Sequence, residues 1–145
     1  MQHRPYLMTS AILGLLALIN TVWLRHYTVS TVIAVALYLL VLVLAYFGGR
    51  AARLAHGRPA WFGGTIGALF GIIAGCGSFL IHATSRDIDA PSKGLARLKI
   101  IALANSPAAH IAVVVTATLT FGVISLIIAA VGAGTVKEPG SPGAA

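Results

Sequence analysis

The chain has 145 residues, of which 58% are hydrophobic and only 9% are charged. Soluble domains usually carry about 25% charged residues, so this composition excludes an ordinary soluble protein. The formal net charge is +7. The basic residues lie between long apolar stretches, as they do in membrane proteins, and this distribution argues against nucleic acid as a partner. The sequence therefore predicts an all-α integral membrane protein whose first partner is the lipid bilayer.

The first apolar stretch, residues 6–24, predicts a transmembrane helix, because about 20 mostly apolar residues span a bilayer. Trp23 and Tyr27 lie where interfacial aromatic residues are common, and the stretch has no convincing signal-peptide cleavage site. We therefore expect a retained helix. Asn20, its only strongly polar residue, predicts one hydrogen bond to a neighbouring helix or at the interface.

Residues 29–47 predict a second transmembrane helix, separated from the first by a short turn. Gly48 and Gly49 predict its end, because glycine is common just after the last turn of a helix. Residues 48–60 are then expected to form a loop.

This loop is the most basic short segment of the chain and holds no acidic residue. Positive residues in short loops stay in the cytoplasm, where they can also contact lipid headgroups. The sequence therefore predicts a cell-membrane protein with a cytoplasmic loop and cytoplasmic termini. The basic residues concerned are Arg50, Arg53 and Arg58.

Residues 61–83 predict a third transmembrane helix with glycines at a strict spacing of four. Each glycine inside a helix costs about 1 kcal/mol relative to alanine, so four in register need a reason. In membranes the usual reason is the close approach of a second helix. We expect either the first helix, through Gly14, or the same helix of another subunit. The glycines are Gly63, Gly67, Gly71 and Gly75.

Between the third and fourth spans the chain becomes more polar. Residues 94–105 predict a short helix at the membrane surface, with Lys93, Arg97 and Lys99 reaching lipid headgroups. Ser106 as helix N-cap and Pro107 as first helical residue predict the start of the fourth span.

The fourth span is expected over residues 108–130. Together with the preceding helices it completes a four-helix bundle, a single membrane domain over residues 1–133. The Gly-, Pro- and Ala-rich residues 134–145 predict a disordered tail.

One group of residues suggests binding chemistry. His82, at the end of the third span, and His110, at the start of the fourth, are expected at the same interface, with Asp87 and Asp89 nearby. These side chains can supply metal ligands, or the two histidines can bind haem from opposite faces. No ligand spacing specifies either group, and interfacial anchoring is the simpler interpretation. The sequence predicts no cofactor.

The expected function follows from what the spans lack. They contain no charged residue, unlike most ion-coupled carriers, and no arrangement typical of an intramembrane protease. We therefore expect a protein that is not an enzyme and acts by helix packing, as a homo-oligomer or as an accessory or assembly subunit of other membrane proteins. One alternative is a small oligomeric pore or carrier built around the third helix. Another is a metal- or haem-binding membrane protein that uses His82 and His110.

Overall fold

The computed structural model describes residues 4–84 and 94–136, and every element in these ranges is helical. Four helices are long and apolar enough to cross a membrane, the third of them continued by the short 3-10 helix η1. This confirms the predicted all-α, four-span architecture. In chain order the elements are α1 (Arg4–Trp23), α2 (Thr28–Leu54), α3 (Pro59–Cys76), η1 (Gly77–Leu80), α4 (Leu95–Ala104) and α5 (Pro107–Gly134).

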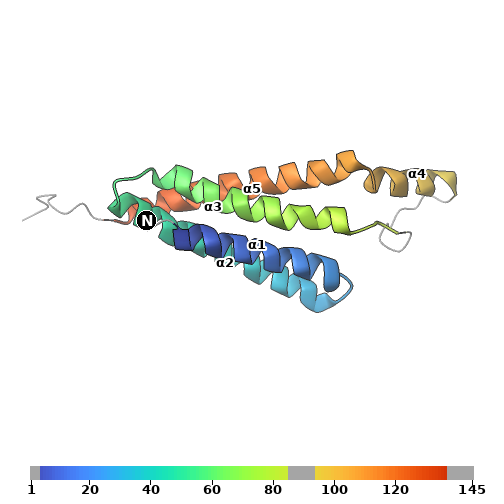
Figure 1. Cartoon of the computed structure of the whole chain (residues 1–145), viewed down its shortest axis with the longest axis horizontal. Helices are drawn as coiled ribbons and strands as arrows, with labels where there is room; N and C mark the ends of the chain where they lie inside the picture. Colours follow the sequence, from blue (N-terminus) through green and yellow to red (C-terminus); the bar gives the residue numbers. More distant parts are fainter. Residues whose placement is uncertain (1–3, 85–93, 137–145) are drawn as a thin grey trace, which may run out of the picture.

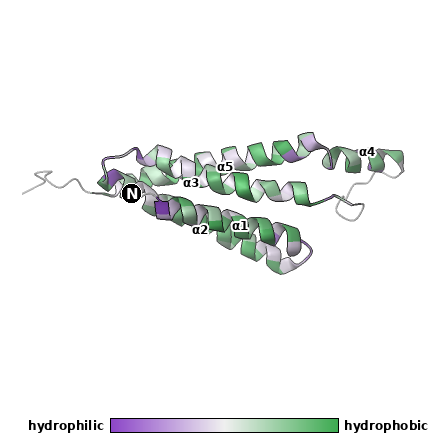
Figure 2. Cartoon of the chain, viewed as in Figure 1, coloured by the Kyte–Doolittle hydropathy of each residue, from purple (hydrophilic) through white to green (hydrophobic). Residues whose placement is uncertain are grey.

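The long helices form an elongated bundle that is hydrophobic along most of its length (Figures 1 and 2). The most extensive contact is between α3 and α5. The start of α1, the end of α5 and the α2–α3 connection lie at one end of the bundle, while η1 and α4 lie at the other (Figure 1). Toward the α4 end, the α1–α2 pair diverges from the α3–α5 pair.

The bundle core is small, and its main cluster lies between α1, α2 and α3, with α5 packed against it. Val41, Ile66 and Phe70 are completely buried, while most other large apolar side chains are exposed, as expected for helices that face lipid. The Ser10 hydroxyl donates a hydrogen bond to the Ile66 carbonyl oxygen at 2.6 Å, which ties α1 to α3. The Asn20 side-chain amide donates to the Ser30 carbonyl oxygen at 3.1 Å, confirming the predicted interhelical hydrogen bond.

The α3 glycines lie directly against α5. A Cβ atom added at Gly71 would stand 2.6 Å from the Ala117 carbonyl oxygen, and one added at Gly75 would stand 2.9 Å from the Val114 Cα. Because Cβ atoms do not approach other atoms so closely, only glycine permits this spacing between the helices. At Gly63 and Gly67 the added atom would meet Ala129, and Phe121 with Ser125, closer still.

This arrangement corrects the expected partner of the third helix. The glycine face of α3 is covered by α5 of the same chain, not by α1 or a second subunit. Gly14 of α1 does contact α3, but at Phe70 and Ile73, which lie on another face. The spacing alone could not identify the partner, because any helix with small residues can occupy such a groove. Formation of a homo-oligomer, or of a complex with other membrane proteins, stays a prediction.

Gly48 and Gly49 do not end the second helix, and this prediction is wrong. Both glycines are buried inside α2, which continues to Leu54. A Cβ atom at Gly48 would stand 2.8 Å from the Ile66 Cδ1, and one at Gly49 would collide with the backbone of Ala129. The glycines therefore serve helix packing, and the packing outweighs their low helix propensity.

The α2–α3 connection is consequently shorter than the predicted loop. Arg50 and Arg53 lie on the last turns of α2, and only Arg58 lies in the connection itself. His56 turns the chain with a positive φ of 55°, and the Gly57 amide donates to the Ala52 carbonyl oxygen at 2.8 Å.

The predicted start of the last helix is confirmed. Pro107 is its first residue, and the Ser106 hydroxyl accepts a hydrogen bond from the Ala109 amide at 3.2 Å. The short helix before it, α4, also matches the prediction, and its position at the membrane surface stays a prediction. The helix α5 runs to Gly134, a turn beyond the expected end, and the predicted disordered tail lies mostly outside the described residues.

Candidate functional site

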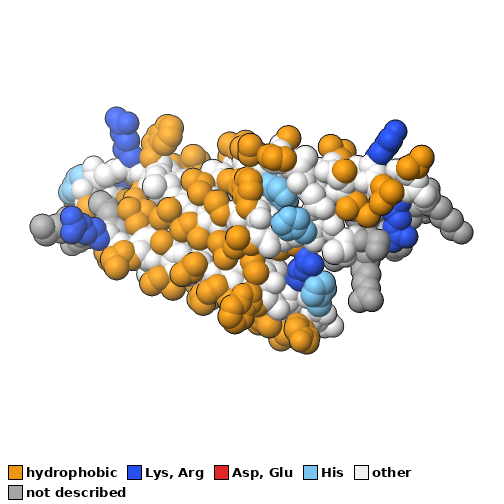
Figure 3. All heavy atoms as spheres, turned by 45° about the vertical axis from the view of Figure 1, so that its right-hand side comes forward, with side chains coloured by type: hydrophobic (Ala, Val, Ile, Leu, Met, Phe, Trp, Pro, Cys, Tyr) orange, Lys and Arg blue, Asp and Glu red, His pale blue; other side chains and the backbone are white. Residues whose placement is uncertain are grey.

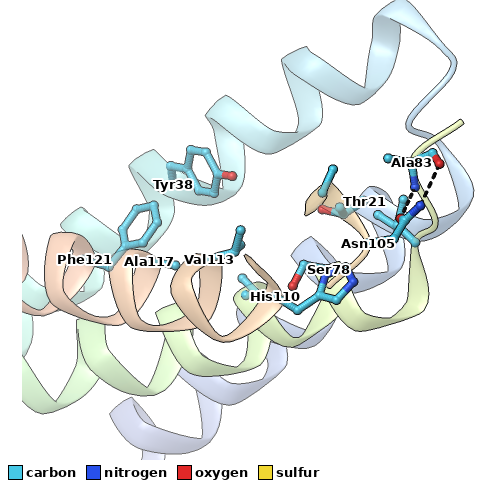
Figure 4. Close-up of a pocket in the computed structure, with 13 residues that line it drawn as sticks. Thr21, Tyr38, Ser78, Ala83, Asn105, His110, Val113, Ala117 and Phe121 are labelled. Carbon is cyan, nitrogen blue, oxygen red and sulfur yellow. Dashed lines mark hydrogen bonds between the residues drawn. The ribbon is translucent and has the colours of Figure 1, made fainter. Parts of the chain in front are cut away.

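A cavity of about 360 Å³ lies where the two helix pairs diverge, beside η1 and the junction of α4 with α5 (Figure 4). Its size is at the lower end of the range for small-molecule sites, which is about 300–1,000 Å³. All four long helices contribute to its lining. The polar side chains that line it are Thr21, Tyr38, Ser78, Asn105 and His110.

His110 is placed in the cavity by the first turn of α5. The Ser106–Pro107 start fixes where this helix begins, and the His110 amide donates to the Ser106 carbonyl oxygen at 3.2 Å. The half-buried imidazole packs against the Phe79 ring at a centroid distance of 5.1 Å. His110 therefore places an imidazole, the most common general acid–base group of enzymes, at the cavity.

Ser78 supplies a hydroxyl with unused hydrogen-bonding capacity. Its Oγ atom is buried, yet it has no hydrogen-bond partner among the described residues. Buried polar atoms in native structures nearly always have a partner, so the unpaired hydroxyl of a residue that lines a cavity is a candidate contact for a ligand. Thr21, by contrast, donates its hydroxyl to the Ala17 carbonyl oxygen at 2.8 Å within its own helix.

Asn105 shapes the cavity from the α4–α5 junction. Its Oδ1 accepts from the Ala83 amide at 2.7 Å, and its Nδ2 donates to the Ala83 carbonyl oxygen at 3.0 Å (Figure 4). The side chain therefore pairs with the backbone as a neighbouring strand would. This pairing holds the segment after η1 against the start of α5.

The remaining wall is apolar and aromatic. Val113, Ala117 and Phe121 line it from successive turns of α5. The Phe121 ring packs against Tyr38 and Phe70, each at a centroid distance of 4.9 Å. These rings contact both helix pairs at the depth where the pairs begin to diverge.

The structure describes two of the four residues that were predicted to act together, and both lie at the same end of the bundle. His110 lines the cavity, whereas His82 is exposed in the segment after η1 at the same end of the bundle. Asp87 and Asp89 lie outside the described residues, as does Lys93. Within residues 4–84 and 94–136, no three His, Cys, Asp or Glu side chains are placed to hold a metal ion.

The predicted basic residues lie at both ends of the bundle. Arg97 and Lys99 are on α4, at the end of the bundle that holds the cavity, and the arginines of the α2–α3 region are at the opposite end. On the face shown in Figure 3, hydrophobic side chains cover most of the bundle between its ends, and several histidines lie where this surface gives way to polar side chains. This distribution fits a bundle that crosses the bilayer along its long axis.

Ser78, Asn105 and Tyr38 were missed by the sequence analysis. Asn105 had a usable signal, since a strongly polar amide directly before the Ser106–Pro107 helix start is unusual in so apolar a chain. Ser78 and Tyr38 had none, because their positions in the cavity depend on how the helices diverge.

Comparison with known families gives one match. The family model described as "Heparan-alpha-glucosaminide N-acetyltransferase, catalytic" matches residues 24–136, which cover most of the chain. This range contains α2 to α5 and every polar residue of the cavity except Thr21. No curated protein and no solved structure is significantly similar to the chain.

This match overturns the function expected from the sequence. The prediction that the protein is not an enzyme and acts only by packing in assemblies is wrong, because the matching family is one of acetyltransferases. The pore alternative falls with it, whereas metal or haem binding by His82 and His110 is not tested by the match and stays a prediction. The absence of charged residues from the spans did not exclude an enzyme, because acyl transfer can use a histidine and neutral hydrogen-bond donors. The chain belongs to the heparan-alpha-glucosaminide N-acetyltransferase catalytic family.

Proposed function

We propose that this chain forms a membrane-embedded acetyltransferase site that transfers an acetyl group to the amino group of an amino sugar. The observation that carries the proposal is the position of His110 in a ligand-sized cavity, within the range that the acetyltransferase family model matches. The cavity is the site of the reaction, and His110 is the general base.

The reaction moves one proton from the acceptor nitrogen to the leaving group, and His110 can carry it. The acceptor nitrogen attacks the carbonyl carbon of the acetyl donor, a C–N bond forms, and the bond between that carbon and the leaving group breaks. The nitrogen must then lose a proton. The neutral imidazole takes it and returns it to the leaving group, so atoms and charge balance without a covalent enzyme intermediate.

Ser78 serves the other half of the reaction. Negative charge develops on the acetyl carbonyl oxygen as the nitrogen attacks, and a preorganised donor in a water-poor site stabilises that charge. The Ser78 hydroxyl has no competing partner among the described residues, so it is free to donate to this oxygen. Asn105, already bonded to Ala83, acts as a positioning residue.

The cavity also favours the reactive form of the acceptor. No Lys, Arg, Asp or Glu side chain from the described ranges lines the cavity. A low-dielectric site disfavours a charged ammonium group, so an amine that enters loses its proton more readily than in water. Only the neutral amine has the lone pair that attacks the acetyl group.

Replacement of His110 tests the proposal. Purified protein in lipid nanodiscs is incubated with acetyl-labelled acetyl-CoA as the donor probe and methyl α-glucosaminide as the acceptor. We expect His110→Ala to lower the rate of N-acetylation by about 100-fold or more, the usual contribution of general acid–base catalysis. His82→Ala is the matched control, since His82 is exposed at the same end. Equal rates for wild type and His110→Ala would disprove the assignment.

We further propose that the cavity opens on the side of the cell membrane away from the cytoplasm. The basic α2–α3 region supports a cytoplasmic position for its own end of the bundle, and the cavity is at the other end. Single cysteines at Ala55 and Thr84, in a Cys76→Ala background, test this in intact cells. An impermeant thiol reagent is expected to label position 84 and not position 55, and the opposite pattern would reverse the orientation.

A further inference from the structure

Tyr38 brings a hydroxyl group to the cavity from the helix pair opposite His110. It lies on α2, which rises about 15 Å between Thr28 and Tyr38 at about 1.5 Å per residue, so its ring is deep within the span. Figure 4 shows the hydroxyl of Tyr38 pointing into the cavity. His110 and Ser78 line the same cavity from α5 and η1. The α1–α2 pair and the α3–α5 pair thus both present polar groups to a bound molecule.

The Tyr38 ring is held in place by two other aromatic rings. It packs edge-on against Phe70 at a centroid distance of 5.8 Å, and it packs against Phe121 at 4.9 Å. Phe70 is completely buried and also contacts the Phe121 ring, so the three rings support one another. A side chain that is already fixed loses little conformational entropy when it binds a ligand. The Tyr38 hydroxyl is therefore a preorganised hydrogen-bonding group.

This hydroxyl has no partner among the residues that the structure describes, which contact Tyr38 only through its ring. The Tyr46 hydroxyl, in contrast, is hydrogen-bonded to the Thr135 hydroxyl at 3.3 Å. A tyrosine hydroxyl that is removed from water usually has a partner, and hydrocarbon supplies none. Tyr38 is 38% exposed, so a molecule in the cavity can reach it and supply the missing hydrogen bond.

We propose that Tyr38 determines the specificity of the site, and that its hydroxyl bonds to a hydroxyl group of the amino sugar whose amino group lies at His110. The inference rests on the proposed function and names the residue that distinguishes a sugar from other amines. A sugar hydroxyl both donates and accepts hydrogen bonds, as the tyrosine hydroxyl does. A simple amine has no such group and leaves Tyr38 unpaired.

The wall between the two residues suits a neutral sugar ring. On α5 the lining runs from His110 to Phe121, a rise of about 16 Å at about 1.5 Å per residue. Val113 and Ala117, which line the cavity between these two ends, are small or apolar. A sugar placed along this wall has its amino group at the shallow end and its hydroxyls toward Tyr38 at the deep end. It therefore bridges the two helix pairs.

Acceptors that lack single hydroxyl groups test the contact. Methyl α-glucosaminide and a set of analogues, each without one hydroxyl, are acetylated by wild-type protein and by Tyr38→Phe in lipid nanodiscs. For the wild type, loss of one particular hydroxyl is expected to lower kcat/KM about tenfold or more, because the Tyr38 hydroxyl is then left unpaired. Tyr38→Phe should lower kcat/KM for methyl α-glucosaminide by a similar factor and show no further loss with that analogue.

Tyr46→Phe is the matched control, since it removes a tyrosine hydroxyl from the opposite end of the bundle. Its preference among the acceptors should equal that of the wild type. Because the Tyr38 hydroxyl bonds to no described residue, Tyr38→Phe should unfold at the wild-type temperature, and a lower rate then does not reflect a damaged fold. If Tyr38→Phe and the wild type had the same ratios of kcat/KM among the acceptors, the inference would be wrong.

Binding without an acetyl donor separates failure of the inference from failure of the proposed function. Saturation-transfer difference NMR follows the binding of methyl α-glucosaminide and its analogues to the protein in nanodiscs. Binding that depends on one hydroxyl and on Tyr38 supports the inference, even if no acetylation is detected and the proposed function fails. Acetylation that depends on His110, with binding that is the same in Tyr38→Phe, overturns the inference and leaves the proposed function intact. Absence of binding to the wild type also overturns the inference.

Discussion

The two ends of the bundle differ in how closely their helices pack. At the packed end, defined by Gly49, Gly63, Ala129 and Gly132, the backbones of α2, α3 and α5 nearly touch. At the open end, defined by Ser78, Asn105 and His110, the helix pairs diverge around a cavity. Glycine and alanine form the helix contacts at the first end, while polar side chains line the cavity at the second.

The difference shows how a small membrane protein can hold a cavity. In lipid, helix association depends on close packing, because hydrocarbon surrounds the helices whether or not they are in contact. A cavity forfeits such contacts, since atoms that line a void lose their neighbours. The packed end supplies the missing contacts, and three residues, Phe70, Phe121 and Tyr38, mark the boundary where packing gives way to the cavity.

The largest effect on stability is expected at the packed end. Gly63→Ala would place a Cβ atom against Ala129 and 2.6 Å from the Ser125 carbonyl oxygen, so α3 and α5 must separate. We expect the free energy of unfolding to fall by about 3 kcal/mol, the upper part of the usual range for overpacking. Thermal unfolding followed by gel filtration in mild detergent measures this.

The adjacent glycine provides the control for that change. A Cβ atom at Gly64 would stand 3.5 Å from the Leu126 Cβ, an ordinary contact. Gly64→Ala should therefore leave stability unchanged or raise it by up to about 1 kcal/mol through better helix propensity. If both alanine variants unfolded like the wild type, the packed end would not limit the stability of the bundle.

The packed end was more accessible to sequence reasoning than the open end. A spacing of four glycines predicts close packing whatever the partner is, and the four apolar stretches predict the spans. The partner itself left a signal that was overlooked: Ser125, Ala129 and Gly132 on α5 are small residues at helical spacing, and all are buried. Their match to the α3 glycines became evident only from the three-dimensional contacts.

The site could be predicted only in part. His110 was recognised as a candidate residue, but with metal binding or haem binding as its chemistry and His82 as its partner. Its surroundings depend on the divergence of the helix pairs and on the pairing of Asn105 with Ala83, which are long-range properties. Local patterns in the sequence carry no information about such geometry, and this is why the enzymatic character of the chain was missed.

A moderate effect is expected from loss of the clamp at the open end, the pair of hydrogen bonds between Asn105 and Ala83. Asn105→Ala removes both hydrogen bonds to Ala83, and at about 1 kcal/mol net for each bond the free energy of unfolding should fall by about 2 kcal/mol. The freed segment also widens the site, so KM for methyl α-glucosaminide should rise more than kcat falls. Asn105→Asp keeps the acceptor for the Ala83 amide, so its stability and its KM should lie between those of the wild type and of Asn105→Ala. An unchanged KM in Asn105→Ala would show that the clamp does not shape the binding site.

The smallest effect on stability is expected at two serines whose Oγ atoms are buried and that lie in different regions of the bundle. Ser78 and Ser125 each have a buried Oγ atom with no hydrogen-bond partner among the described residues. Ser78 lines the cavity, whereas Ser125 is packed against Gly67 between α3 and α5. Removing either hydroxyl breaks no hydrogen bond in the described parts of the chain, so unfolding should shift by less than about 1 kcal/mol in both variants.

Their activities should differ, because Ser78 lines the cavity and Ser125 does not. Loss of a donor to a developing oxyanion costs about 100-fold or more in rate, and we expect a loss of this order for Ser78→Ala. Ser125→Ala should acetylate methyl α-glucosaminide at the wild-type rate. Ser78→Thr, which restores a hydroxyl, should recover part of the activity. Equal activity of the Ser78→Ala and Ser125→Ala variants would remove Ser78 from the reaction and would leave its unpaired hydroxyl at the open end without a catalytic role.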